Sequence, residues 1–274
     1  MGKKSGIHHP LKLPKSHLNR FTKKMNKKIT ILFFVALFLW ACYETEVSFK
    51  SLINGFADVN FFISEMFPPD FSEVSKVFPD FITTLKMAFV STFYGAFLAY
   101  PIAILAANTV TKTKFLNVFF RVFLNLVRTI PDLLLAALCV ALFGANPFAG
   151  IIALSFFSFG IISKLLYESL ESLDENSLDP IRAVGGSWLS KIKYGIAPAV
   201  LPQFLSYCLY VFEINIRAAA IIGLVGAGGI GTWLNINFDL GQYNKISSLL
   251  LTLFLIVATI DFISSKIRKR LTDS

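Results

Sequence analysis

Charged residues are scarce in this sequence. Of its 274 residues, 16% are charged, 55% are hydrophobic and 29 are phenylalanine. A soluble domain usually carries about 25% charged residues, and the mean hydropathy here is +0.64. These values exclude a disordered chain, a disulfide-rich secreted module and an ordinary soluble enzyme. They indicate a protein whose main solvent is the lipid bilayer.

Cysteine and histidine are also sparse. Cys42, Cys139 and Cys208 each lie inside an apolar stretch and lack the spacing of a metal site, so we interpret them as small buried hydrophobic residues. The three histidines all lie within the first 17 residues. We therefore expect no metal ion, no bound cofactor and no histidine-based catalysis within the membrane.

Positive charge is concentrated at the start of the chain. Nine of the 26 basic residues lie between Lys3 and Lys28, and no acidic residue accompanies them. A basic segment ahead of a hydrophobic run is typical of a cytoplasmic flank attracted to anionic lipid. We expect no nucleic-acid partner.

Six apolar stretches predict an all-α, polytopic membrane protein with about six transmembrane helices. They cover residues 29–43, 81–107, 118–143, 148–167, 199–222 and 247–264. The first is shorter than the roughly 20 residues of a usual span. It could be the apolar region of a signal peptide, although a retained helix is favoured, and whether it crosses the bilayer is left open.

Charges in the connections support this count. Residues 44–80 contain seven acidic residues and two lysines, whereas the tail 265–274 has four basic residues and one acidic residue, and the connection 168–198 contains Arg182, Lys191 and Lys193. Alternation of this kind follows the positive-inside tendency. It predicts cytoplasmic tails at 1–28 and 265–274, an extracytoplasmic segment at 44–80 and a membrane core at 81–264. The protein is expected in the inner or plasma membrane with both termini in the cytoplasm.

Two pairs of charges occur at membrane depth. Arg128 and Asp132 are four residues apart, as are Glu213 and Arg217, so each pair is predicted to share one helical face. The pairs could be salt bridges that fix packing. They could instead line the pathway of an anion, because guanidinium suits a phosphate-like oxyanion and Asn125 and Asn215 could add neutral hydrogen bonds. Pro131 predicts that the backbone departs from regular helix near Arg128.

A run of glycines between 226 and 231 matches the GxGxxG pattern of dinucleotide sites. It follows an apolar helix instead of a strand, and no acidic residue lies about 20 positions further on. We therefore interpret the glycines as a tight, non-helical passage between the fifth and sixth spans.

The connection 168–198 is long and carries turn signals, which indicates an element that docks a protein partner. Asp179 is a plausible N-cap of a short helix over 180–184, and Ser187 of a second one reaching Tyr194. The run Asp179-Pro-Ile-Arg-Ala-Val-Gly185, followed by Pro198, resembles the EAA loop of ABC-importer permeases. Asp-Pro-Ile stands where that loop usually has Glu-Ala-Ala.

Three other stretches resemble the phosphonate-importer permease family. They are Arg128-Thr-Ile-Pro-Asp132, the segment 204–217 and the glycine-rich segment 223–231. The resemblance implies a type I ABC importer fold and a non-enzymatic permease subunit that moves phosphonate, or phosphite or phosphate, into the cytoplasm. It also implies a second copy of the chain, a cytosolic ATPase dimer that uses ATP and Mg²⁺, and an extracytoplasmic phosphonate-binding protein.

The same resemblance assigns roles to particular residues. Contacts with the ATPase would come from Asp179, Arg182, Ala183, Gly185, Gly186 and Ser187, and the substrate pathway from Arg128, Asp132, Glu213, Asn215 and Arg217. An ion-coupled secondary transporter of a small oxyanion is the alternative, since such proteins also bury charge pairs. That alternative gives the long docking connection no purpose.

Overall fold

The computed structural model describes residues 27–45, 49–174 and 179–272. The chain divides into two compact units, residues 1–61 and 62–274, which are described separately. Most of the basic segment 1–28 lies outside the described residues.

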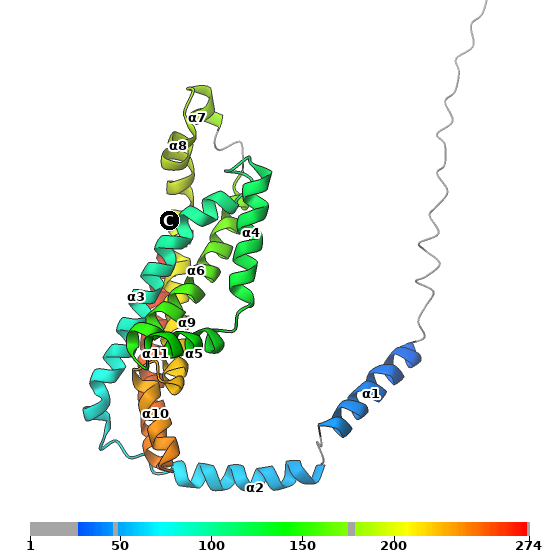
Figure 1. Cartoon of the computed structure of the whole chain (residues 1–274), viewed down its shortest axis with the longest axis vertical. Coiled ribbons are helices and arrows are strands. Elements are labelled where there is room, and N and C mark those ends of the chain that lie inside the picture. Colours follow the sequence, from blue (N-terminus) through cyan, green and yellow to red (C-terminus); the bar gives the residue numbers. More distant parts are fainter. Residues whose placement is uncertain (1–26, 46–48, 175–178, 273–274) are drawn as a thin grey trace, which may run out of the picture. The chain divides into compact units, whose positions relative to one another are not determined.

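The first unit contains α1 (Lys27–Glu44) and most of α2 (Phe49–Met66) (Figure 1). The apolar part of α1, Ile29–Glu44, is shorter than the four helices that are long and apolar enough to cross a membrane, as the sequence predicted for the first stretch. The helix α2 was not anticipated. It lies within the expected extracytoplasmic segment 44–80, whose last residues belong instead to the next helix.

The second unit is a helical bundle, and the part of the chain that the structure describes contains no strand. Its helices are α3 (Val74–Ala106), α4 (Lys114–Thr129), α5 (Asp132–Phe143), α6 (Pro147–Ser172), α7 (Asp179–Ala183), α8 (Trp188–Lys191), α9 (Ala197–Ile222), α10 (Ile230–Asp239) and α11 (Tyr243–Thr272). The predicted all-α fold is confirmed.

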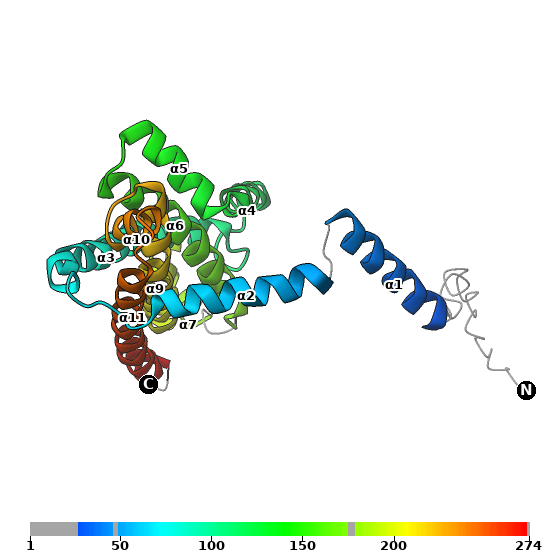
Figure 2. The ribbon, with the colours of Figure 1, turned by 90° about the horizontal axis from the view of Figure 1, so that it is seen from below.

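Four of these helices are long and apolar enough to cross a membrane, namely α3, α6, α9 with its preceding turns, and α11. The pair α4 and α5 is apolar enough to count as a fifth span if it is taken as one broken span, since its two helices are bent by 82° at the break between them. Figure 2 shows this bend, because α5 is seen lengthwise where α4 is seen end-on. With α1, these elements account for the six predicted stretches.

The bundle centre depends on small residues that let α3 approach α6. A Cβ atom at Gly95 would lie 2.4 Å from the Cβ of Ser158, and Ala99 and Ala103, one and two turns later, are fully buried. Close backbone approach of this kind is how helices associate in lipid. Since apolar side chains gain little by leaving lipid, this fit is a main source of packing energy here.

A buried amide joins three helices at the same level. The Asn215 Nδ2 of α9 donates to Thr92 Oγ1 of α3 at 2.8 Å and to Ser158 Oγ of α6 at 2.7 Å. Hydrogen bonds of this type contribute about 0.6 kcal/mol on average between membrane helices. Asn215 therefore fixes the register of α3, α6 and α9.

The glycine-rich segment turns the chain sharply between α9 and α10. It begins with a short 3₁₀ helix, Gly223–Val225, and continues through Gly226, whose φ of 91° is left-handed. The backbone N–H of Ile230 then donates to Thr84 Oγ1 of α3 at 2.9 Å. The predicted non-helical passage is confirmed, although α10 also stands between the fifth and sixth spans. A hydroxyl from α3 takes the place of a capping side chain, since the N-cap residue of α10 is Gly229.

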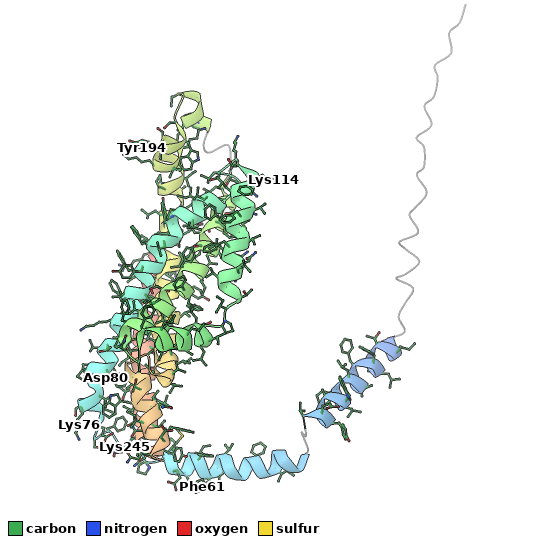
Figure 3. All side chains as sticks on the ribbon, viewed as in Figure 1. Phe61, Lys76, Asp80, Lys114, Tyr194 and Lys245 are labelled. Atoms are coloured by element: carbon green, nitrogen blue, oxygen red, sulfur yellow. The ribbon has the colours of Figure 1, made fainter. Side chains whose placement is uncertain are left out.

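The labelled residues of the second unit lie at its two ends. Figure 3 shows Tyr194 and Lys114 at one end and Asp80, Lys76 and Lys245 at the other. At the latter end, Lys245 Nζ contacts Glu73 Oε1 at 2.8 Å. The helix α11 continues to Thr272, so the expected tail 265–274 is helical for most of its length.

Candidate functional site

The predicted break near Arg128 is present. The helix α4 ends at Thr129, Ile130 is extended with φ −77° and ψ 121°, and α5 begins at Asp132. Pro131 lacks an N–H and disfavours helical geometry in the residue before it. The expectation that Arg128 and Asp132 share one helical face is therefore wrong. Their helices diverge by 82°, and within the described residues they form no ion pair.

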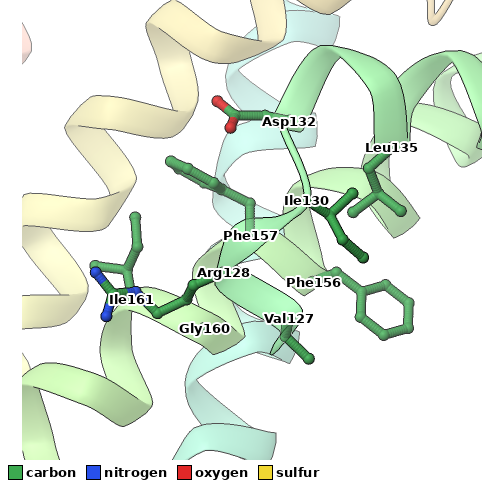
Figure 4. A pocket seen from close by; sticks show the side chains of 9 residues that line it. All are labelled: Val127, Arg128, Ile130, Asp132, Leu135, Phe156, Phe157, Gly160 and Ile161. Carbon is green, nitrogen blue, oxygen red and sulfur yellow. The ribbon is translucent and has the colours of Figure 1, made fainter. Parts of the chain in front are cut away.

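A cavity of 190 Å³ lies at this break. Figure 4 shows the Arg128 and Asp132 side chains apart from each other, with Phe157 between them in this view. Gly160 of α6 leaves the room that Arg128 occupies, because a Cβ there would lie 3.0 Å from Arg128 Cγ. The lining residues are Val127, Arg128, Ile130, Asp132, Leu135, Phe156, Phe157, Gly160 and Ile161.

This cavity combines one guanidinium with mostly apolar walls. Arg128 is an exposed residue in a span, and an arginine in hydrocarbon costs on the order of 3 kcal/mol even on insertion scales. Such a residue is expected to face water or a ligand. The planar fork of guanidinium can bind an oxyanion with two hydrogen bonds, while the aromatic walls suit an apolar substituent.

The second predicted pair lies on α9, where Glu213 is 7% exposed. Its Oε1 lies 3.1 Å from the Arg268 Nη2 of α11, so its ion pair comes from another helix and not from Arg217 one turn along. The Asp261 carboxyl of α11 also approaches Glu213. Arg217 is exposed on the surface of the unit. Glu213 thus helps join α9 to α11, which leaves Arg217 as the accessible charge of the predicted pair.

Sequence reasoning missed Arg268, which was included in the basic tail. A signal was available, because Asp261 and Arg268 are seven residues apart and lie on one face of a helix that continues beyond residue 264. Asn215 does not line the cavity. It is fully buried and uses its amide protons to join α3 and α6.

The predicted docking connection contains two short helices. The first, α7, begins at Asp179, one residue earlier than expected, and includes Ala183. Gly185 is left-handed with φ 72°, and the Gly186 N–H donates to Ile181 O at 2.9 Å. The side chains of Asp179 and Arg182 lie outside the described residues.

The second short helix is capped as predicted, since Ser187 Oγ accepts from the Ser190 N–H at 3.3 Å. It ends at Lys191, however, and a π-helix over Ile192–Ile196 replaces the expected α-helix through Tyr194. We call residues 179–191 the docking segment. Large apolar side chains are exposed on and beside it, among them Val184 at 83% and Leu189 at 69%. Such a surface suits a protein partner.

Comparison with known structures defines the class of fold. The chain superimposes on the solved structure of the MetNI methionine ABC transporter in an inward-facing conformation with a TM-score of 0.62 and 21% identity. The match covers 71% of this chain and 95% of that chain. The helices are therefore arranged as in a type I ABC importer permease.

Sequence comparison defines the family. Residues 99–273 match the family described as the binding-protein-dependent transport system inner membrane component. The chain is 31% identical to the phosphite transport system permease protein PtxC of Stutzerimonas stutzeri over 243 residues, which cover 88% of each chain. It is also 39% identical over 118 residues to PhnE2 of Escherichia coli, a candidate cryptic phosphonate transport system permease. That match covers 43% of this chain and 97% of PhnE2.

The chain belongs to this family of inner-membrane transport components. It is a multi-pass permease subunit and not an enzyme. Membership in this family does not favour the alternative function, an ion-coupled secondary transporter.

Proposed function

We propose that this chain forms the transmembrane pathway through which an ATP-driven importer moves phosphonate into the cytoplasm. The observation that carries the proposal is the accessible Arg128 at a helix break inside a membrane span, beside a cavity of 190 Å³. An oxyanion ligand gives this guanidinium a binding partner at that depth. Asp132 at the start of α5 also lines this cavity. Its carboxylate would repel anions that Arg128 does not bind.

A phosphonate is preferred over phosphate or phosphite because of the cavity walls. Six apolar side chains surround the single arginine, and a phosphonate combines a tetrahedral oxyanion with an organic substituent. Phosphite and phosphate share the oxyanion but carry no organic substituent that could contact the apolar walls. PtxC is a phosphite permease by name and PhnE2 is named for phosphonate, so all three ions belong in the test.

The remaining subunits follow from the same proposal. Two copies of the chain would enclose the pathway, with Arg217 of each copy lining it. A cytosolic ATPase dimer would bind the docking segment through Asp179, Arg182, Ala183, Gly185, Gly186 and Ser187. ATP and Mg²⁺ would bind the ATPase and not this chain, and an extracytoplasmic binding protein would deliver the ligand. Both termini of the chain would lie in the cytoplasm.

Purification from the native membrane in mild detergent tests the assembly. We expect an ATPase with a phosphate-binding loop to co-purify in about equal amount. Proteoliposomes containing this complex and its binding protein should import methylphosphonate only with ATP inside, and excess phosphite or phosphate should compete less well than methylphosphonate. Uptake without ATP, or a complex that lacks an ATPase, would reject the proposal.

Substitution of Gly186 tests the docking assignment. A Cβ at this position would lie 2.7 Å from the backbone oxygen of Ile181, so Gly186→Val must displace α7. Strain of this size costs about 1–3 kcal/mol, and we expect co-purified ATPase to fall about tenfold.

Gly241→Asn is the matched control for this variant, because Gly241 lies between α10 and α11 and outside the docking segment. Gly241 has a left-handed φ of 66° and no atom within 4 Å of the place its Cβ would take, and asparagine tolerates left-handed backbone. This variant should retain most of the ATPase. Equal ATPase binding by Gly186→Val and wild type would contradict the docking assignment.

A further inference from the structure

Within the described residues, the docking segment contacts the membrane bundle by two routes. The first is the chain itself, which enters α9 through the π-helix Ile192–Ile196. This helix contains Gly195 and is followed by Pro198. π-Helices are rare and are frequent at functional sites. Residues 188–225 nevertheless form one continuous helical run, so the direct route carries a displacement into α9 and does not reach α4.

The second route is a side-chain contact. The indole Nε1 of Trp188, at the start of α8, donates to the backbone oxygen of Val110 at 3.3 Å. Val110 is buried and lies in the turn 107–113, which joins α3 to α4. Trp188 therefore connects the docking segment to the start of a helix that is remote in sequence.

The turn that receives Trp188 is held rigidly. Thr109 Oγ1 donates to Leu170 O at 2.9 Å, and the Asn108 N–H donates to Glu171 Oε1 at 3.0 Å. Arg121 of α4 forms an ion pair with the same carboxylate and donates from Nε to Ala106 O at 3.0 Å. These contacts join the end of α3, the start of α4 and the end of α6.

The helix α4 connects this turn to the cavity. Arg121 lies near its start and Arg128 seven residues later, which is about 10 Å along the axis. Beyond Arg128 the chain bends by 82° into α5. A displacement applied to the turn would move α4 as a rigid body and change the angle at the break that lines the cavity.

We propose that Trp188 is a positioning residue that transmits displacement of the docking segment to α4, and through α4 to the cavity at Arg128. This inference rests on the proposed function, since it assumes that an ATPase moves the docking segment. It adds a second route from ATP hydrolysis to the pathway, separate from the covalent connection to α9.

The substitution Trp188→Phe tests the proposal because it keeps an aromatic ring and removes the N–H donor. We expect normal amounts of permease and co-purified ATPase, with an unchanged substrate concentration for half-maximal uptake. The maximal uptake rate should fall about fivefold, the factor that one net hydrogen bond is worth, while ATP hydrolysis falls less. The measured ratio of ATP hydrolysed to substrate imported should therefore rise.

Trp233→Phe is the matched control. Trp233 Nε1 also donates a hydrogen bond, to Asp80 Oδ2 at 2.8 Å, but at the opposite end of the unit. Loss of this hydrogen bond should leave the ratio of ATP hydrolysed to substrate imported unchanged.

Thr109→Val removes the hydrogen bond that joins the turn to α6. If Trp188 and Thr109 act on the same route, the double variant Trp188→Phe/Thr109→Val should have the same ratio as whichever single variant has the higher ratio.

The outcomes separate this inference from the proposed function. If the wild-type chain binds no ATPase, the proposed function fails before Trp188 is tested. If the wild type binds the ATPase but Trp188→Phe loses it, Trp188 belongs to the docking surface and the inference is overturned. The inference is also overturned if Trp188→Phe has the same ratio of ATP hydrolysed to substrate imported as wild type. It is overturned too if the effects of Trp188→Phe and Thr109→Val on this ratio add up in the double variant.

Discussion

Replacement of Arg128 by alanine is expected to lower phosphonate uptake by at least about a hundredfold. The reason is that two charge-assisted hydrogen bonds to an oxyanion would be lost, each worth about 1.5–3 kcal/mol. No ion pair with Asp132 is broken, because α4 and α5 diverge between them. The protein should therefore remain stable, and the loss should appear in transport measured with radiolabelled methylphosphonate in proteoliposomes.

Two variants separate the role of the guanidinium from that of charge and position. Arg128→Lys keeps the charge but not the planar fork, so uptake should be intermediate. Asn125→Ala removes an exposed polar side chain one turn earlier on the same helix and should transport normally. Near-normal uptake by a well-expressed Arg128→Ala variant would remove Arg128 from the pathway.

Arg217 provides an independent comparison. It is the accessible member of its pair, since Glu213 is buried and contacts Arg268. If the pathway includes α9, Arg217→Ala should also reduce uptake. Arg268→Ala should mainly lower stability instead, because it leaves the buried Glu213 carboxyl without its cation.

The spans were predictable because lipid imposes one simple requirement, a run of apolar residues of sufficient length. The break at Ile130–Pro131 was predictable for a local reason, since proline acts on its own and the preceding residue. The size of the bend was not predictable. It depends on how α5 packs against α6, which follows it, and against α9, which is distant in sequence. Hence the break beside Arg128 was predicted correctly, while the pairing of Arg128 with Asp132 was wrong.

Contacts between distant segments account for the other differences. Asn215 has the same polarity whether it lines a pathway or joins helices, and only its neighbours Thr92 and Ser158 distinguish the two roles. Trp188 lies 78 residues from Val110, and no local pattern indicates that contact. The docking segment could be located from its length and turn residues, because these are local properties.

Replacement of Gly231 by alanine is expected to destabilise the protein strongly. A Cβ at Gly231 would lie 2.0 Å from the backbone oxygen of Ala220 and 2.7 Å from Gly223 Cα. Both contacts are with backbone, so relief requires α10 to move away from the end of α9. Such a movement would strain the hydrogen bond from the Ile230 N–H to Thr84.

The cost of this overpacking is about 3 kcal/mol, which corresponds to a melting temperature lower by about 10 °C for a chain of this size. Gly55→Ala is the matched control, because no atom lies within 4 Å of the place its Cβ would take and alanine favours helix. Thermal unfolding of both detergent-purified variants checks the expectation. If Gly231→Ala melts within about 2 °C of wild type, the tight passage from α9 to α10 is not what holds this end of the bundle together.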